Sequence, residues 1–346
     1  MAQKNKSGPA IGLDIGTYSI KCVEVSWEAG VYRLQRVAIL PLNAPQGELP
    51  KTEDIQKALK GLFETFGGHP GSLRISVTGP SLLMRPIKLP VMTPAELKGA
   101  ILFEAESQIP FPVNDCLLEF QILGTAADGK NMNVLLVAAK KDFIQERLKL
   151  LSALNVAPEI IDVDIFCLMN AFEILGEGTA QKTYGLLDIG YSVSSLAILR
   201  DKLPFVVRDI PVGDSGISQC LSGLKGLPEA EADRLKIDCP EDLREDLKNA
   251  IIKGTQPLVE EIKHSVDYFE NETGESLKDI FVSGGGALTE GLTAIFSEEL
   301  GMRVGLWDNL KKLDISPGVD RKYLTGHSQE LNVALGLALR KQGQKE

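Results

Sequence analysis

Two short stretches of the chain are almost alike: GLDIGTYSIKCVEV at residues 12–25 and LLDIGYSVSSLAIL at residues 186–199. In each, apolar and β-branched residues flank an Asp-Ile-Gly, a pattern that predicts a strand, a tight turn and a second strand. One such turn could be an ordinary hairpin, because Asp and Gly are common turn residues. Two copies half a chain length apart indicate two homologous domains that face each other across a cleft.

The residues of the first copy suit a phosphate group. Glycine lets the backbone approach a bulky anion, and the N–H groups of the turn can then point at the phosphate oxygens. Thr17 and Ser19 add hydroxyl donors, and Lys21 adds a positive charge. Asp14 cannot face a phosphate alone, but it can do so through Mg²⁺ and the waters of that ion.

A third element is DIFVSGGGALTEGL at residues 279–292. An apolar strand that ends in three glycines at the start of a helix suits a flat ligand on bare backbone, and a helix N-terminus favours an anion. Such a glycine run can also be only a tight turn between strand and helix. Neither G-x-G-x-x-G nor G-x-x-x-x-G-K-[ST] is present, which disfavours a Rossmann or P-loop site.

Composition excludes several classes of protein. A formal net charge of −10 and a pI near 5.1 disfavour nucleic-acid binding, which normally needs a basic patch. No run of about 18 apolar residues exists, so any membrane role is expected to depend on a protein partner. The missing signal-peptide pattern and five scattered cysteines favour reduced thiols in the cytoplasm. The three histidines lie too far apart to predict a metal site.

The segment at 85–161 differs in character from the rest of the first half. Thr93, Pro94 and Glu96 predict a capped helix start, and Pro110 predicts its end. Two strands and a second helix follow, so this segment is predicted to be a small α+β unit inserted into the first domain. In the second half, Pro257 is predicted to start a further helix.

Together the two hairpins and the strand-GGG-helix element resemble the actin, Hsp70 and sugar-kinase superfamily. Within it, the chain resembles the PilM family of actin-like type IV pilus assembly proteins over nearly its whole length. The phrase most specific to that family, AELKGAI followed by EAESQIPFP, lies in the inserted segment. The other matching phrases are IGLDIGTYSIKCVEV, IIDVDIFCLMNAF, LLDIGYSVSSLAIL, RDIPVGDSGISQ, EIKHSVDYFENETG and DIFVSGGGALTEGL.

The resemblance implies an α/β, actin-like (ASKHA) two-domain nucleotide-binding fold with a small α+β subdomain inserted in the first half. Residues 1–9, and likewise 341–346, are expected to be disordered tails. The implied domains are 10–84 with 162–182 and 327–346 (1A), 85–161 (1C), and 183–326 (2A/2B, with 2B at about 211–270).

The family's site residues carry over to matching positions of this chain. The first phosphate motif is Asp14, Gly16, Thr17, Tyr18, Ser19 and Lys21, and the second is Asp188, Gly190, Tyr191, Ser192 and Ser194. The adenosine motif is Gly284, Gly285 and Gly286, with Gly213. Asp233 and Lys236 resemble a helix that flanks the adenosine, although Asp233 replaces the usual Glu. The implied cofactors are ATP and Mg²⁺, with Asp14 and Asp188 binding the metal through water.

Asp164 is the candidate catalytic residue, because family members often have D-V-E where this chain has DVD at 162–164. A shorter carboxylate would reach an attacking water less well, so ATP hydrolysis is expected to be slow at most. The alternative is that Asp164 only caps the following helix.

The implied function is an ATP-binding cytoplasmic scaffold of the pilus inner-membrane complex. Its implied partner is the cytoplasmic N-terminal peptide of PilN, a single-pass membrane protein, and self-association is possible. Phe103, Ile109 and Phe111 are candidates for lining the peptide groove, unless they form the ordinary core of the inserted unit. The alternatives are a small-molecule kinase of the same superfamily and a filament-forming protein similar to FtsA.

Overall fold

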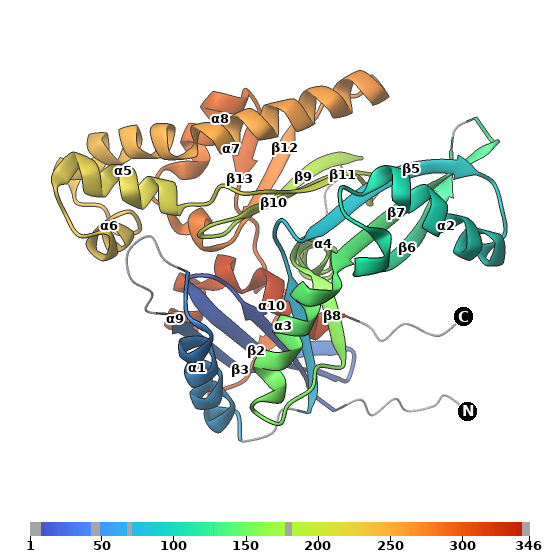
Figure 1. Ribbon diagram of the computed structural model, residues 1–346. Coiled ribbons are helices and arrows are strands. Elements are labelled where there is room, and N and C mark those ends of the chain that lie inside the picture. Colours follow the sequence, from blue (N-terminus) through green and yellow to red (C-terminus); the bar gives the residue numbers. More distant parts are fainter. Residues whose placement is uncertain (1–7, 43–48, 68–70, 127, 177–181, 341–346) are drawn as a thin grey trace.

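The computed structural model describes residues 8–42, 49–67, 71–126, 128–176 and 182–340. Most of the predicted N-terminal tail (1–7) and the predicted tail at 341–346 therefore lie outside the described residues. The described chain forms two lobes, each built on its own β-sheet, and a smaller subdomain at their side (Figure 1).

The first lobe has a six-stranded sheet in the order β14-β3-β2-β1-β4-β8. Its strands are β1 (Ala10–Ile15), β2 (Ser19–Glu28), β3 (Val31–Pro41), β4 (Ser72–Val77), β8 (Ile160–Val163) and β14 (Leu313–Ile315). Its helices are α1 (Thr52–Thr65), α4 (Asp164–Leu175), α9 (Arg321–Gly326) and α10 (Asn332–Leu339), with a 3-10 turn, η4 (Ser328–Leu331), before α10.

The second lobe has a five-stranded sheet in the order β11-β10-β9-β12-β13. Its strands are β9 (Thr183–Ile189), β10 (Ser194–Arg200), β11 (Leu203–Ile210), β12 (Asp279–Ser283) and β13 (Arg303–Gly305). Its helices are α5 (Ser215–Lys225), α6 (Glu229–Leu235), α7 (Arg244–Thr273) and α8 (Leu292–Leu300), with 3-10 turns η2 (Glu241–Leu243) and η3 (Gly285–Leu288).

The two sheets repeat one arrangement, as the duplicated sequence predicts. In the first, β1 pairs antiparallel with β2, β2 antiparallel with β3, and β1 parallel with β4. In the second, β9, β10, β11 and β12 pair in the same way. Each sheet has its own buried apolar cluster, so each lobe can hold its hairpin rigidly.

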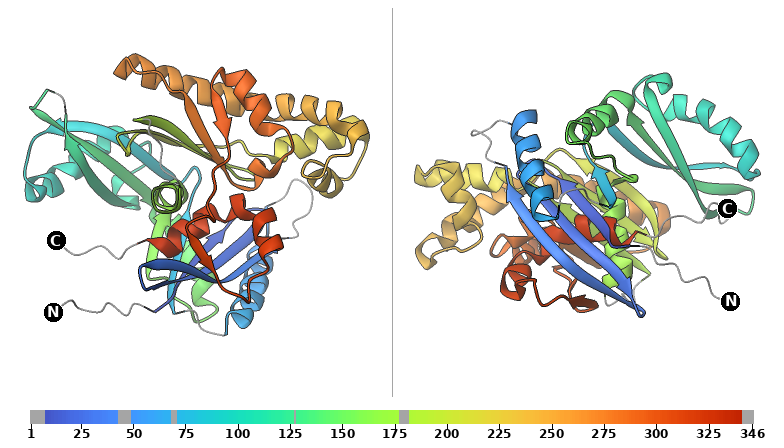
Figure 2. Two further views of the ribbon diagram at one scale, coloured as in Figure 1. Left: turned by 180° about the vertical axis from the view of Figure 1, so that it is seen from behind. Right: turned by 90° about the horizontal axis from the view of Figure 1, so that it is seen from below.

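The inserted unit forms a three-stranded antiparallel sheet in the order β5-β7-β6, covered on one face by a helix (Figures 1 and 2). Its elements are β5 (Leu82–Pro90), α2 (Pro94–Gln108), η1 (Val113–Asp115), β6 (Cys116–Thr125), β7 (Asn131–Lys140) and α3 (Lys141–Ser152). The predicted capping box is confirmed, since the Thr93 side chain and the Glu96 backbone N–H are bonded and the Glu96 carboxylate accepts from the Thr93 N–H. We call this unit the inserted subdomain.

Two expectations about the second half are corrected. Pro257 does not start a helix but lies inside the 30-residue α7. Pro257 has no N–H for the preceding turn, which normally costs about 3 kcal/mol. Buried residues nevertheless continue on both sides of it, from Leu247 to Phe269, so packing against the second sheet keeps the helix in one piece.

The second correction concerns the point at which the chain returns to the first lobe. The predicted boundary lies at 326/327, but β14 already pairs with β3 of the first sheet. A three-residue strand gives too weak a sequence signal to be recognised. The division into domains otherwise stays a prediction.

Helix α10 is the most enclosed helix of the first lobe, with all eight residues buried. It lies between β1 and α4, where two glycines permit backbone contact. A Cβ on Gly12 would lie 1.9 Å from the carbonyl oxygen of Ala334, and one on Gly336 would lie 1.8 Å from that of Cys167. Buried Arg74 donates to the carbonyls of Leu337 and Ala338 at the C-terminal end of this helix.

We therefore expect Gly336→Ala to lower the free energy of unfolding by at least about 3 kcal/mol, because the new methyl group overlaps a backbone carbonyl. Urea unfolding followed by circular dichroism would measure the loss. Gly223→Ala on α5 is the matched control, since nothing lies within 4 Å of its Cβ position. It should leave stability unchanged or raise it by about 0.4–1 kcal/mol. Equal stability of the two variants would contradict this account of α10.

Candidate functional site

The two predicted phosphate turns have the same backbone geometry. The Gly16 N–H donates to the Ser19 carbonyl oxygen at 3.1 Å, and the Gly190 N–H donates to the Val193 carbonyl oxygen at 3.1 Å. A Cβ on Gly16 would lie 2.9 Å from the Ser19 oxygen, and one on Gly190 would lie 2.7 Å from the Val193 oxygen. Each turn therefore requires its glycine, for the same steric reason.

The tips of the two turns touch each other between the lobes. The hydroxyl oxygens of Thr17 and Ser192 lie 3.2 Å apart. Beside them, the rings of Tyr18 and Tyr191 pack with their centroids 4.9 Å apart and their planes tilted by 31°. The structure thus brings together residues 175 positions apart in the chain, from the two motifs that the sequence singled out.

Beneath the tips lies a cluster of carboxylates from both lobes. Asp14 and Lys21 are opposite each other in the β1–β2 register, and Asp14 Oδ2 lies 3.1 Å from Lys21 Nζ. Burial and the nearby charge of Asp14 raise the pKa of Asp188 to about 6. Burial and Asp14 likewise raise the pKa of Asp164, the first residue of α4. Two of these carboxylates, Asp14 and Asp188, act on the largely buried Lys21, and the cluster is an environment that a cation would stabilise.

The predicted metal ligands fit a hydrated ion. The charge of Asp14 on β1 raises the pKa of Asp188 on β9, so the two carboxylates of opposite lobes lie near each other. Within the described residues, no three His, Cys, Asp or Glu side chains are close enough together to hold an ion directly. Mg²⁺ usually retains several waters, and binding of Mg²⁺ through water by these two residues stays a prediction.

A network of buried charged side chains lies in the second lobe, near its glycine turn. Lys236, whose side chain is 4% exposed, lies 2.8 Å from Asp214 and 3.0 Å from Asp233. The Lys236 ammonium also lies 5.8 Å from the centroid of the Tyr191 ring, and the Tyr191 hydroxyl donates to Glu229 at 2.9 Å. Asp233 and Lys236, the two residues predicted to flank adenosine, thus form an ion pair with each other. Lys236 also lies over the ring of Tyr191 at the tip.

Most of the predicted glycines are required by the packing of the chain itself. A Cβ on Gly213 would lie 2.3 Å from the Tyr191 carbonyl oxygen, because the start of α5 lies directly on the second turn. Gly284 has φ of +89°, and a Cβ on Gly286 would lie 2.4 Å from the Ile189 side chain. Gly285 alone of these four has nothing within 4 Å of its Cβ position, so it is the glycine that offers bare backbone to a ligand.

Two predicted hydroxyl donors are buried within their own lobes. Ser194 is fully buried and donates to the Val212 carbonyl at 2.7 Å. Ser19 is 3% exposed, at the start of β2. Both lie within their hairpins, and the hydroxyls at the tips belong to the partly buried Thr17 and Ser192.

No motif in the sequence indicates a role for Glu330. It lies in η4, pairs with His327 Nδ1 at 2.5 Å, and is 11% exposed. Burial alone would lower the pKa of Lys21, but the charges of Asp14 and Glu330 outweigh it and the pKa is raised. The neighbouring Gln329 carbonyl accepts from the Gly284 N–H at 3.0 Å, which joins the glycine run of the second lobe to the first lobe. The segment HSQELN carries no motif, so only the tertiary structure reveals it.

The candidates for the partner groove lie on the inserted subdomain in different environments. Phe103 on α2 is 77% exposed. Ile109 belongs to the subdomain's buried cluster, and Phe111 packs against that cluster with the Lys140 ammonium 5.1 Å from its ring centroid. Contact of these three residues with a partner stays a prediction.

The elevated pKa of Asp188 predicts a pH effect on stability. Between its ordinary pKa of 3.8 and about 6, the folded protein holds a proton that the unfolded chain has lost. The contribution of this residue to stability is therefore complete below pH 4 and is lost as the pH rises through 6, by at most about 3 kcal/mol. Asp188→Asn should be more stable than the wild type at pH 7.5, with a smaller difference at pH 4.5.

Urea unfolding of both proteins at the two pH values measures this difference. Asp267→Asn, on the exposed side of α7, serves as the control. A stability difference between Asp188→Asn and wild type that does not change with pH would show that the ionised Asp188 carboxylate is not strained in the fold.

Comparison with known proteins finds similarity over nearly the whole chain. The family model for type IV pilus assembly protein PilM matches residues 12–342. The solved structure described as the PilM-PilN type IV pilus biogenesis complex is 25% identical, with a TM-score of 0.82 over 95% of this chain and 97% of that one. The ethanolamine utilization protein EutJ from Carboxydothermus hydrogenoformans shares the fold, with a TM-score of 0.55 at 13% identity over 98% of this chain and 92% of that one.

Among the described residues, no helix combines the length and the apolar character that crossing a bilayer requires. The two matching lobes, the hairpin tips that meet between them and the inserted subdomain form the actin-like α/β fold. Since the family model covers all but the ends of the chain, the protein belongs to the PilM family of type IV pilus assembly proteins.

Proposed function

We propose that this protein is an ATP-binding scaffold of the type IV pilus inner-membrane assembly complex, located in the cytoplasm and held at the membrane through a protein partner. The partner is the cytoplasmic N-terminal peptide of a PilN-like single-pass membrane protein. The observation that carries the proposal is the similarity, over 95% of the chain, to the structure described as a PilM-PilN complex. Family membership favours this scaffold over a small-molecule kinase.

The space between the lobes has the groups that are needed to bind a nucleoside triphosphate. The two glycine turns present backbone N–H groups, Thr17 and Ser192 present hydroxyls, and Lys21 supplies a positive charge. Mg²⁺, when bound, would neutralise charge on the phosphates and on the aspartates Asp14 and Asp188. Gly285, with open space at its Cβ position, would lie beneath the nucleoside.

Hydrolysis is proposed to be slow at most. Asp164, half-buried at the start of α4, would be the carboxylate that orients a water molecule. Its side chain is one methylene shorter than that of glutamate, and burial together with Asp14 disfavours its charged form. A nucleotide that persists in the cleft would hold the two lobes together, which suits a scaffold better than a fast enzyme.

Binding of the membrane partner is assigned to the inserted subdomain. Helix α2 exposes Phe103 and Leu102, at 77% and 51%, in the segment whose sequence is most specific to the family. An extended peptide can place alternate apolar side chains against such residues. The protein would thus reach the membrane through its partner.

Calorimetric titration with Mg-ATP tests the nucleotide site. Lys21→Ala combined with Asp188→Ala should weaken binding at least about 100-fold, because each charge-assisted contact contributes about 1.5–3 kcal/mol. Lys278→Ala, on the outer side of the second lobe, should bind as the wild type does. Unchanged ATP affinity in a folded double variant would defeat the proposal.

Co-purification with the tagged N-terminal peptide of the PilN-like protein, with and without ATP, tests the partner. Phe103→Ser should lose at least about tenfold in affinity, because burying an exposed Phe contributes about 1.5–3 kcal/mol. Leu224→Ser, at a 49% exposed position on α5, is the control for removing a surface apolar group.

Two further measurements test the alternative functions. Sedimentation with ATP would identify a filament-forming protein, and ATP turnover that requires a sugar or an acid would identify a kinase.

A further inference from the structure

Asp209, near the end of β11, holds the entrance to the inserted subdomain from the opposite lobe. Its Oδ2 accepts from the Thr78 hydroxyl at 2.9 Å and from the Gly79 backbone N–H at 2.8 Å. Its Oδ1 accepts from the Ser195 hydroxyl at 2.6 Å. One carboxylate thus bonds to two residues of the first lobe and to one residue of the second.

Thr78 and Gly79 are the residues at which the chain leaves the first sheet. Strand β4 ends at Val77, and β5 of the inserted subdomain begins at Leu82. Gly79 has φ of +120°, a conformation that residues other than glycine rarely adopt, and nothing lies within 4 Å of its Cβ position. These are properties of a hinge, and the Gly79 N–H of that hinge donates to Asp209.

The other end of this connection reaches the nucleotide cleft. Ser195 is the register partner of Asp188, directly behind the second phosphate turn. Val193, in the same turn, lines a cavity of about 240 Å³ together with Gly79, Met84 and Asp209. The cavity leaves room for the hinge to move relative to the turn.

The inserted subdomain rests on both lobes, so its position depends on how they are placed. Its strand β5 lies beside β11 of the second lobe, while its helix α3 packs against α1 of the first (Figure 1). In this structure the lobes meet directly through Thr17 and Ser192. Phosphates gripped by both turns would replace that direct contact, and the separation of the lobes would then depend on the ligand.

We propose that Asp209 is a positioning residue that couples occupation of the nucleotide cleft to the position of the inserted subdomain. It does so by holding the hinge at Thr78 and Gly79 to the strand behind the second phosphate turn. This inference rests on the proposed function and adds to it a route between the two binding sites. Because coupling is reciprocal, ATP alters the affinity for the partner peptide, and the peptide alters the affinity for ATP by the same factor.

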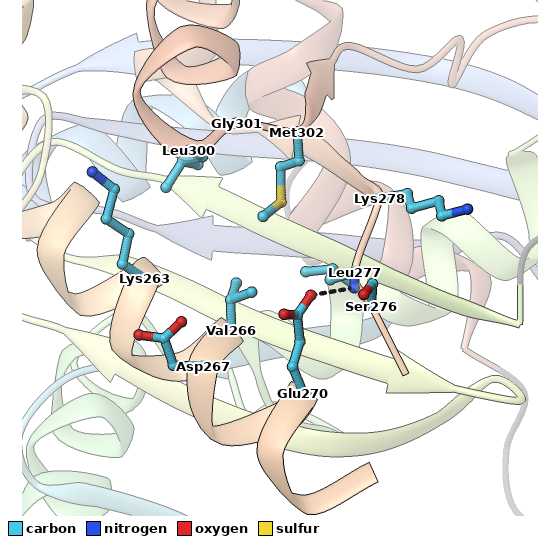
Figure 3. Close-up of a pocket in the computed structure, with 10 residues that line it drawn as sticks. All are labelled: Lys263, Val266, Asp267, Glu270, Ser276, Leu277, Lys278, Leu300, Gly301 and Met302. Atoms are coloured by element: carbon cyan, nitrogen blue, oxygen red, sulfur yellow. Dashed lines mark hydrogen bonds between the residues drawn. The ribbon is translucent and has the colours of Figure 1, made fainter. Parts of the chain in front are cut away.

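The outer surface of the second lobe has a separate cavity with charged residues on its rim. This cavity, of about 480 Å³, lies between α7, the segment that leads into β12 and the end of α8 (Figure 3). Lys263 and Lys278 stand on its rim with Asp267 and Glu270, and the Glu270 carboxylate accepts from the Leu277 N–H at 2.9 Å. The two lysines and the two carboxylates balance in charge.

Hydrogen–deuterium exchange of the full-length protein tests the coupling without the partner. Mg-ATP should change the exchange of residues 78–90 at least about threefold in the wild type. Asp209→Ala should lose that response while its calorimetric ATP affinity stays within about threefold. Thr78→Val, which removes one donor and keeps the side-chain shape, should lose part of the response, and Thr65→Val, whose hydroxyl bonds only within α1, should keep all of it.

The affinity for a synthetic PilN-like N-terminal peptide, with and without saturating Mg-ATP, gives the second readout. The wild type should show at least about a fivefold difference, and Asp209→Ala less than twofold. If the wild type binds ATP and the peptide without either affecting the other, or if Asp209→Ala keeps the full response, the role of Asp209 is wrong. If the wild type does not bind ATP, the proposed function fails as well, and calorimetry separates the two results.

Discussion

The contact between the two hairpin tips is the interaction on which the rest of this structure depends. Each of the two sheets holds a glycine turn in the same shape, and a common apolar core packs the sheets together. The turns meet through Thr17 with Ser192 and Tyr18 with Tyr191. Such a small contact can define the cleft only because both turns are rigid. The start of α5 supports the second turn, and the register of β1 with β2 holds the first.

The cleft carries an electrostatic cost that points to its use. Asp14, Asp188 and Asp164 converge from both lobes, and burial with mutual repulsion disfavours the charged forms of the last two. A protein selected for stability alone would not place three carboxylates where their charges repel one another. A bound cation and polyphosphate would offset that cost, and stability and ligand binding would then be linked through the same residues.

Short sequence patterns predicted those elements that are stabilised by residues close together in the chain. Each Asp-Ile-Gly turn and the capping box of α2 follow from side chains and backbone groups a few residues apart, and they formed as expected. Expectations that depended on distant packing did less well. Pro257 lies within α7 because buried residues on both sides hold it there, and β14 joins the first sheet because β3 offers it an edge. The glycine run was recognised, but which of its glycines faces open space depends on Ile189 and Asp214, which lie far away in the sequence.

The sequence by itself determined that the chain has two related halves, that each half carries an Asp-Ile-Gly turn between two strands, and that a separate unit is inserted into the first. These features repeat or interrupt a pattern, so they can be read without coordinates. Only the tertiary structure decided that Glu330 lies beside Lys21, that Lys236 is enclosed by Asp214 and Asp233, and that Asp209 bonds to the hinge at Gly79. The residues in each of these pairings belong to no recognisable motif. The close packing of whole helices and strands sets their positions, and the spacing of residues in the sequence does not reveal it.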